Sequence, residues 1–204
     1  RELGEIIRLY PDEPETVARQ RISREMVVSE PLFNLGFKDP ALTRLEGDAL
    51  LRRESAMEIM LDIIFAPSEP LFNELYEDTL IDDRFTAGYT AEPSYGFVLI
   101  GGETRDPGTL YERIMEAIAR ARREGFSAEQ FERHRRNRLG SFMRRFNSLE
   151  FVANNYLAYR FRGSDLFNYP AILHQITLEE VQSLLEEVLV PERHAVSVIL
   201  PQKS

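Results

Sequence analysis

The sequence predicts an α+β fold in which helices pack on one face of a mixed or antiparallel sheet. Short runs of alternating apolar and polar residues indicate strands, and longer stretches with apolar residues three or four positions apart indicate helices. Two expected strands, 85–92 and 95–101, are separated only by Pro93-Ser94, and so short a connection makes them antiparallel. The expected order is strand, two helices, two strands, three helices and a final strand.

The first strand is expected within 26–37, where alternate apolar side chains would give one buried face. Asp39-Pro40 has the pattern of a helix N-cap followed by proline, which predicts that a long helix begins there. Pro67 is expected to end that helix, and Ser68 to cap a shorter one.

The run 95–101 is apolar on both faces, which predicts a central strand. It ends at Gly101, where the absence of a side chain suits a close backbone approach. The segment 165–176 is expected to be short and helical or irregular, interrupted by Pro170, and 194–200 is expected to be the last strand. Other helix starts and stops are indicated by Asp106-Pro107, by Gly125, and by Thr177 with Glu180.

The stretch 127–163 is the longest with helical periodicity, and a sheet beneath it would bury its apolar face. Ser127 and Gln130 form a capping-box pattern at its start, and a bend is expected near Asn147-Ser148. Its apolar face is predicted to comprise Phe131, Leu139, Phe142, Phe146, Leu149, Val152 and Tyr156. Its other face is expected to be solvated or to face another domain, and carries Arg133, Arg135, Arg136, Arg138, Arg144 and Arg145.

Composition narrows the classes of function. The 204 residues include no cysteine, which excludes disulfides, thiol nucleophiles and thiolate metal sites and fits a reducing compartment, so a cytoplasmic location is expected. A formal net charge of −9 disfavours nucleic acid as a partner. No apolar run approaches the roughly 20 residues of a membrane span, and no membrane partner is expected.

No catalytic, cofactor-binding or metal-binding residue is assigned from the residues themselves. Neither HExxH nor HxxEH occurs, and a three-histidine site would need His134, His174 and His194 to meet through folding. Ser141 lies within a helical pattern instead of a nucleophile elbow. A cluster of acidic residues is considered for calcium binding, but it lacks EF-hand spacing and is interpreted as helix-surface carboxylates: Glu69, Glu74, Glu77, Asp78, Asp82 and Asp83.

The glycine pair at the end of the predicted central strand lacks a phosphate-binding motif. Gly101-Gly102-Glu103-Thr104 matches neither GxGxxG nor GxxxxGK[ST], so a plain strand end is preferred.

Aromatic residues crowd the later part of the chain, and helical spacing assigns most of them to a core. Tyr159 or Tyr169 could instead line a peptide-binding wall, with core or interdomain packing as the alternative. The substrate-binding residues are therefore left unassigned.

Three stretches together resemble the second, non-catalytic domain of the M16 (pitrilysin/insulinase) zinc peptidases. They are 67–89, which begins PSEPLFNEL, 94–114, which begins SYGFVLIGG, and 138–189, which begins RLGSFMRRF. Their order and spacing are similar to the family's over about 27–201, and most similar to bacterial members of the processing-protease-like branch.

The resemblance implies a linker remnant over 1–21 and a single C-terminal inactive domain over 22–204. In this family the preceding domain carries HxxEH and the zinc, and the second repeats the fold without metal and helps to enclose unfolded peptides. The implied partners are that HxxEH domain of the same polypeptide, a second M16-like half in a homo- or heterodimer, and a peptide substrate. The family's substrate-contacting Arg before a strand Phe is not carried over, because Gly96 precedes Phe97 here.

Two alternatives remain open. One is an inactive M16-like scaffold or core subunit, and the other is a stand-alone peptide-binding module. An HxxEH motif encoded upstream would favour the peptidase.

Overall fold

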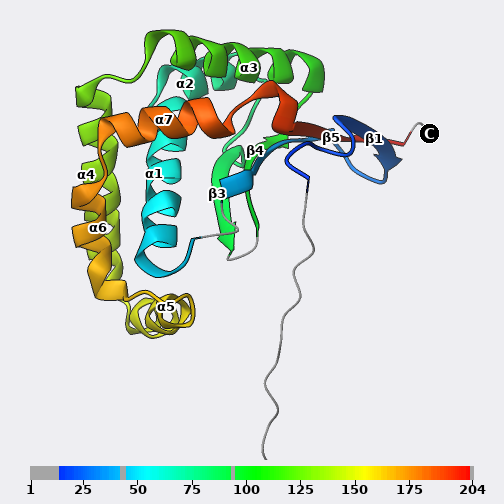
Figure 1. Ribbon diagram of the computed structural model, residues 1–204. Coiled ribbons are helices and arrows are strands. Elements are labelled where there is room, and N and C mark those ends of the chain that lie inside the picture. The colour runs from blue at the N-terminus through cyan, green and yellow to red at the C-terminus, as the bar shows by residue number, and fades with distance from the viewer. Residues whose placement is uncertain (1–13, 42–44, 93–94, 203–204) are drawn as a thin grey trace, which may run out of the picture.

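The computed structural model describes residues 14–41, 45–92 and 95–202, which form one mixed five-stranded sheet and a layer of helices (Figure 1). The spatial order of the strands is β1-β5-β2-β4-β3, with β1 parallel to β5 and the other three pairings antiparallel. The predicted fold class is confirmed. The strands are β1 (Arg21–Met26), β2 (Leu32–Asp39), β3 (Thr86–Glu92), β4 (Tyr95–Glu103) and β5 (His194–Pro201).

Within this layer the helices lie in two rows beside the sheet, with α1 in the nearer row. In Figure 1, α1 lies between the sheet and the pair α4 and α6, α2 and α3 lie at one end of the layer, and α5 lies at the other. Their bounds are α1 Gly47–Phe65, α2 Pro70–Glu77, α3 Pro107–Glu124, α4 Ala128–Arg145, α5 Leu149–Phe161, α6 Tyr169–Gln175 and α7 Leu178–Val188, with 3-10 turns at Leu166–Asn168 and Pro191–Arg193.

The core is organised around α1, which is buried on most of its circumference. Apolar side chains of its second half, such as Ile59, Met60 and Ile63, are at most 4% exposed. The facing side of the sheet contributes Leu35 and Ile100, which are fully buried. The central helix of the domain is therefore α1, and not the longer helical stretch that follows α3.

Two strand assignments made from sequence are wrong in part. The strand expected within 26–37 is two strands, because β1 ends at Met26 and β2 begins at Leu32. All six residues of β1 are exposed, so its sequence has no alternation of buried and exposed residues that would indicate a strand. The strand depends on pairing with β5. The expected strand 95–101 does lie inside the sheet, as β4 between β2 and β3, but it is not buried on both faces, because Leu99 is 43% exposed.

Three terminal residues have different roles from those expected. Asp39 is the last residue of β2: its buried carboxylate accepts from the Ala41 amide and also pairs with Arg53, but α1 begins only at Gly47. Ser68 does not cap α2, whose N-cap position is Glu69. Pro170 lies in the first turn of α6 and starts that helix instead of interrupting it.

The stretch 127–163 is broken where the sequence suggested, but it does not keep one buried face. Ser148 caps α5 by accepting a hydrogen bond from the Phe151 amide, and α5 turns away from α4 (Figure 1). Of the predicted apolar face, Val152 of α5 still packs on the core, but Leu149 is 87% exposed and Tyr156 is 39% exposed. The break changes the direction of the axis, which periodicity within a single helix cannot reveal.

Helix-terminal signals with local partners are confirmed. Ser127 and Gln130 form the complete capping box of α4, and Asp106 accepts hydrogen bonds from two amides in the first turn of α3. Thr177 accepts from the Glu180 amide, and Gly125 ends α3 with a φ of 71°. The turn at Pro93-Ser94 lies outside the described residues.

A glycine pair joins α1 to the end of α5. Gly47 has a φ of 57°, its amide donates to the Arg162 carbonyl, and a Cβ built on it would lie 2.7 Å from the Gly163 carbonyl oxygen. An L side chain at Gly47 would be strained both by its backbone conformation and by this contact.

We expect Gly47→Ala to lower the free energy of unfolding by about 2 kcal/mol or more. Gly88→Ala is the matched control, because a Cβ there meets nothing within 4 Å. Urea denaturation followed by circular dichroism measures both, and equal stabilities for the two variants would contradict this account.

Candidate functional site

A polar cavity of about 360 Å³ lies between α1, α4, α5 and α6. Glu54, Glu58 and Asp62 reach it from α1, where a spacing of four residues places all three on one side of the helix. Arg138 and Arg145 reach it from α4, and two tyrosines complete the polar wall. Acidic, basic and hydroxyl groups therefore line one concave surface.

Arg138 is the cation that neutralises the α1 carboxylates. Its Nε lies 2.7 Å from Asp62 Oδ2, its Nη1 donates to the Glu58 carboxylate, and its Nη2 donates to the Glu58 carbonyl at 3.1 Å. Burial by itself lowers the pKa of Arg138, but the two carboxylates outweigh burial and raise it. The arginine stays charged, and it belongs to the interior and not to a solvated face.

Glu58 and Glu54 have pKa values above the ordinary range, mainly because burial disfavours the charged carboxylate. The charge of Arg138 opposes the shift at Glu58, and Arg162 opposes it at Glu54 through an ion pair of 2.9 Å. Each carboxylate thus has an arginine partner, which leaves neither free to act as an isolated general base.

Both tyrosines named from sequence lie on the cavity wall. Tyr169 is 8% exposed and stacks on Phe142 with ring centroids 4.3 Å apart, whereas Tyr159 is half-buried. Burial raises the pKa of each hydroxyl above its usual range, so both remain protonated donors at neutral pH. The buried Ser55 hydroxyl also faces the cavity: it lowers the Tyr169 pKa somewhat, yet has no hydrogen bond of regular geometry among the described residues.

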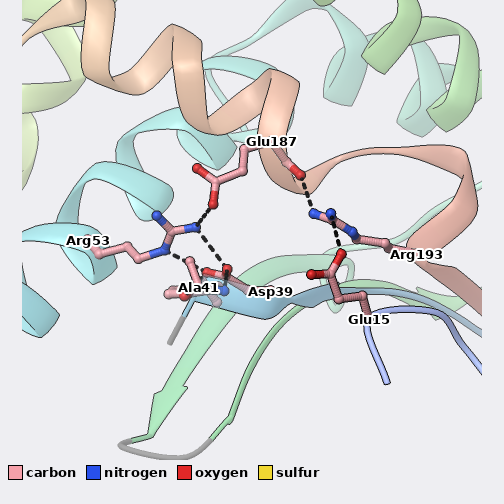
Figure 2. Close-up of polar contacts among 7 residues, drawn as sticks. Glu15, Asp39, Ala41, Arg53, Glu187 and Arg193 are labelled. Carbon is pink, nitrogen blue, oxygen red and sulfur yellow. Dashed lines mark hydrogen bonds and ion pairs between the residues drawn. The ribbon is translucent and has the colours of Figure 1, made fainter. Parts of the chain in front are cut away.

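A second ionic cluster closes the opposite side of α1 (Figure 2). Arg53 donates to both oxygens of Asp39 at 2.8 Å and to Glu187 of α7 at 2.8 Å, and Tyr89 also donates to Asp39. Burial by itself would raise the pKa of Asp39, but the hydrogen bonds from Arg53 and Tyr89 outweigh it and hold that pKa below its usual value. The stabilisation from this carboxylate is therefore present at neutral pH and is lost as the pH falls through its lowered pKa.

Figure 2 also shows Arg193, which makes a separate set of polar contacts next to this ionic cluster. Its guanidinium donates to the Glu187 carbonyl at 2.8 Å and pairs with Glu15 at 3.1 Å. The chain before β1 is thereby attached to the loop before β5.

The three histidines do not meet. His134 is buried in α4 and contacts Glu69 at 2.8 Å, and Arg133 pairs with the same carboxylate at 2.6 Å. His194 donates from Nδ1 to the Pro191 carbonyl, which leaves Nε2 to accept from Tyr111 at 3.1 Å. His174 is exposed at the end of α6.

These side chains do not fit a zinc site. Both ring nitrogens of His194 already have partners, and the cavity carboxylates Glu54, Glu58 and Asp62 are paired with arginine. Across residues 14–41, 45–92 and 95–202, no three His, Cys, Asp or Glu side chains are grouped so that they could hold a metal ion.

The other motifs weighed from sequence have structural roles. Gly101 lies within β4, which continues to Glu103, and a Cβ on it would lie 2.0 Å from the Phe33 carbonyl oxygen, so the close backbone approach is confirmed although the strand end is not. Glu74 and Asp78 pair with Arg113, and Asp82 pairs with Arg84. Glu69 does not lie on the helix surface as expected, because it is only 3% exposed and its carboxylate contacts His134.

Sequence reasoning missed the cavity carboxylates. Their signal was present, since acidic residues at 54, 58 and 62 interrupt an apolar helix on one side. The arginines that pair with them are Arg138 of α4 and Arg162, which follows α5, and nothing in the sequence indicates that pairing.

The sequence model of the peptidase M16 inactive domain matches residues 2–138. The chain belongs to the M16 peptidase family as its inactive domain. The uncharacterized zinc protease YmfH of Bacillus subtilis is 35% identical over 198 residues, which are 97% of this chain and 46% of that protein.

Solved structures agree with this membership in the M16 family. An M16-like peptidase from Alicyclobacillus acidocaldarius superposes with a TM-score of 0.93 and 32% identity, over 99% of this chain and 48% of that one. The peptidase M16 inactive domain from Pseudomonas fluorescens has the same fold, with a TM-score of 0.73 and 18% identity, over 99% of this chain and 47% of that one. This M16 domain therefore spans about half the length of the relatives it matches.

We expect Arg53→Met to destabilise the domain by about 3–5 kcal/mol, because it leaves the Asp39 carboxylate buried without its counter-charge. Arg84→Met is the control, since Arg84 pairs with Asp82 and Glu103 on the surface and its loss should leave stability unchanged. Chemical denaturation at pH 7 measures the stability of both variants. Similar losses of stability would show that burial of the Arg53–Asp39 pair does not determine its contribution.

Arg138→Met should destabilise the domain by about 3 kcal/mol at pH 8 and by clearly less at pH 5. Without Arg138, burial raises the pKa of Glu58 further, so the folded state binds a proton more readily than the unfolded state and regains stability as the pH falls. Arg136→Met on the same helix is the exposed control. Urea titrations at the two pH values measure the difference, and a loss independent of pH would refute the assignment.

Proposed function

We propose that this chain is the non-catalytic half of an M16 zinc peptidase, in which it forms part of the chamber that holds peptide substrates. The observation that carries the proposal is the match of a whole inactive domain to about half of an M16-like peptidase and of a zinc protease. The zinc and its HxxEH motif are assigned to the other half of the same polypeptide, because the described side chains here do not suit a zinc ion.

The polar cavity supports a role in contacting peptide. Its wall presents tyrosine hydroxyls, the Ser55 hydroxyl and paired charges, which are groups that hydrogen-bond to peptide backbones and polar side chains. Of the two tyrosines, Tyr159 is the better candidate for peptide contact, because Tyr169 is buried against Phe142. The contribution proposed is binding and enclosure, without a bond-breaking step by residues of this chain.

The remaining assignments extend the same proposal. Residues 1–21 are proposed as the link between the halves, and residues 22–204 as the domain itself. The active assembly would include the HxxEH half and, in a dimer, a second M16-like half. No helix among the described residues is long and apolar enough to cross a membrane. The absence of cysteine supports the proposed cytoplasmic location.

The proposal predicts that the full polypeptide encoded by the gene binds about one zinc ion and cleaves an unstructured fluorogenic peptide, whereas the 204-residue chain does neither. Metal analysis by mass spectrometry and a fluorescence assay provide the measurements. Tight zinc binding by the 204-residue chain would overturn the proposal. A full polypeptide without zinc or cleavage would instead favour a scaffold subunit, and peptide binding by the 204-residue chain alone would favour a stand-alone binding module.

A further inference from the structure

The helix α5 is apolar on two opposite sides. One side packs on the core through the partly buried Phe151, Val152 and Tyr159. The other side is exposed and carries apolar residues at intervals of four: Leu149, Ala153, Leu157 and Phe161. No residue of α5 is fully buried. A helix with apolar rows on two opposite sides is normally packed on both, but residues 14–41, 45–92 and 95–202 leave the second row of α5 exposed.

The exposed residues form a continuous ridge suited to packing against protein. Residues four apart on a helix lie in one row, and such rows fit into the grooves of other helices. The row from Leu149 to Phe161 is about 18 Å long. Leu149, Leu157 and Phe161 are 87%, 53% and 86% exposed, which is costly for side chains of this size in water.

The apolar surface continues beyond the helix. Phe167, which is 62% exposed, lies 6.4 Å from the ring of Tyr156 on α5. The two charged residues of α5, Glu150 and Arg160, are exposed and lie beside this row, each three residues from one of Ala153 and Leu157 and seven from the other. We call Leu149, Ala153, Leu157, Phe161 and Phe167 the outer surface of α5.

Polar anchors hold the far end of α5 to the domain. The Arg162 carbonyl accepts from Gly47, and the Arg162 side chain pairs with Glu54 and donates to the Ala91 carbonyl at 2.9 Å. These contacts fix the position of the helix, which lies at the end of the helical layer (Figure 1). The exposed ridge is thus held in place and is not a frayed end.

We propose that the outer surface of α5 is the site where the other half of the polypeptide packs. The inference rests on the proposed function. We assign the other half as the partner because the relatives that match 97% and 99% of this chain contain about as much protein again outside the match. An obligate partner within one polypeptide explains why a row of large apolar residues stays uncovered in this chain.

Thiol labelling tests the proposal directly, because the 204-residue chain has no cysteine of its own. Leu157→Cys and Tyr76→Cys are each made in this chain and in the full polypeptide, and the rate of maleimide modification of the labelled peptide is followed by mass spectrometry. Tyr76 on α2 is the matched control, since it is 54% exposed and Leu157 is 53% exposed.

The expected result is modification of Leu157→Cys at least about tenfold slower in the full polypeptide than in the 204-residue chain, with little change at Tyr76→Cys. Equal rates at Leu157→Cys in both proteins would overturn the proposal. So would slow, concentration-dependent labelling already present in the 204-residue chain, which would indicate a second copy as the occupant. Protection that appears only when an unstructured peptide is added would indicate substrate instead, and would also overturn it.

The outcome is separable from the proposed function. Protection of Leu157→Cys without zinc or peptide cleavage would retain the docking surface and reject the peptidase. Zinc and cleavage with an accessible Leu157→Cys would retain the peptidase and reject this surface.

Discussion

The structure depends on the pairing of the charges carried by its central helix. Because α1 is surrounded by the sheet and by other helices, its ionisable residues cannot all reach water, and a buried charge without a partner is strongly destabilising. Each pairing therefore ties α1 to a different element: Arg52 to Glu180 of α7, Arg53 to Asp39 of β2, Glu54 to Arg162 after α5, and Glu58 and Asp62 to Arg138 of α4.

The same pairing limits the chemistry of the domain. Carboxylates that neutralise arginines are poor metal ligands and poor general bases, so the polar cavity suits binding better than bond cleavage. An M16 inactive domain fits this description, because the contribution proposed for it is binding and enclosure. Tyr159 on the cavity wall and the outer surface of α5 belong to one helix. The proposed peptide contact and the proposed interdomain packing therefore lie next to each other.

Much of the fold could be predicted because its signals are local. The capping box at Ser127 and Gln130 and the stop at Gly125 involve residues within one turn, so their patterns hold in any tertiary context. The strand β1 could not be predicted, since it is exposed on both faces and exists through pairing with β5. Asp39 does accept from the nearby Ala41 amide, but its carboxylate also pairs with Arg53 and Tyr89, and α1 begins only at Gly47.

By itself, the sequence determined the class of fold, most helix boundaries and the absence of a recognisable catalytic motif, because composition, periodicity and capping act over a few residues. Only the tertiary structure decided that α1 is the central helix, that Arg138 is internal, and that α5 leaves a row of large apolar side chains exposed. Those properties depend on which distant groups share a desolvated space, and burial of charge and of apolar area is set by that arrangement.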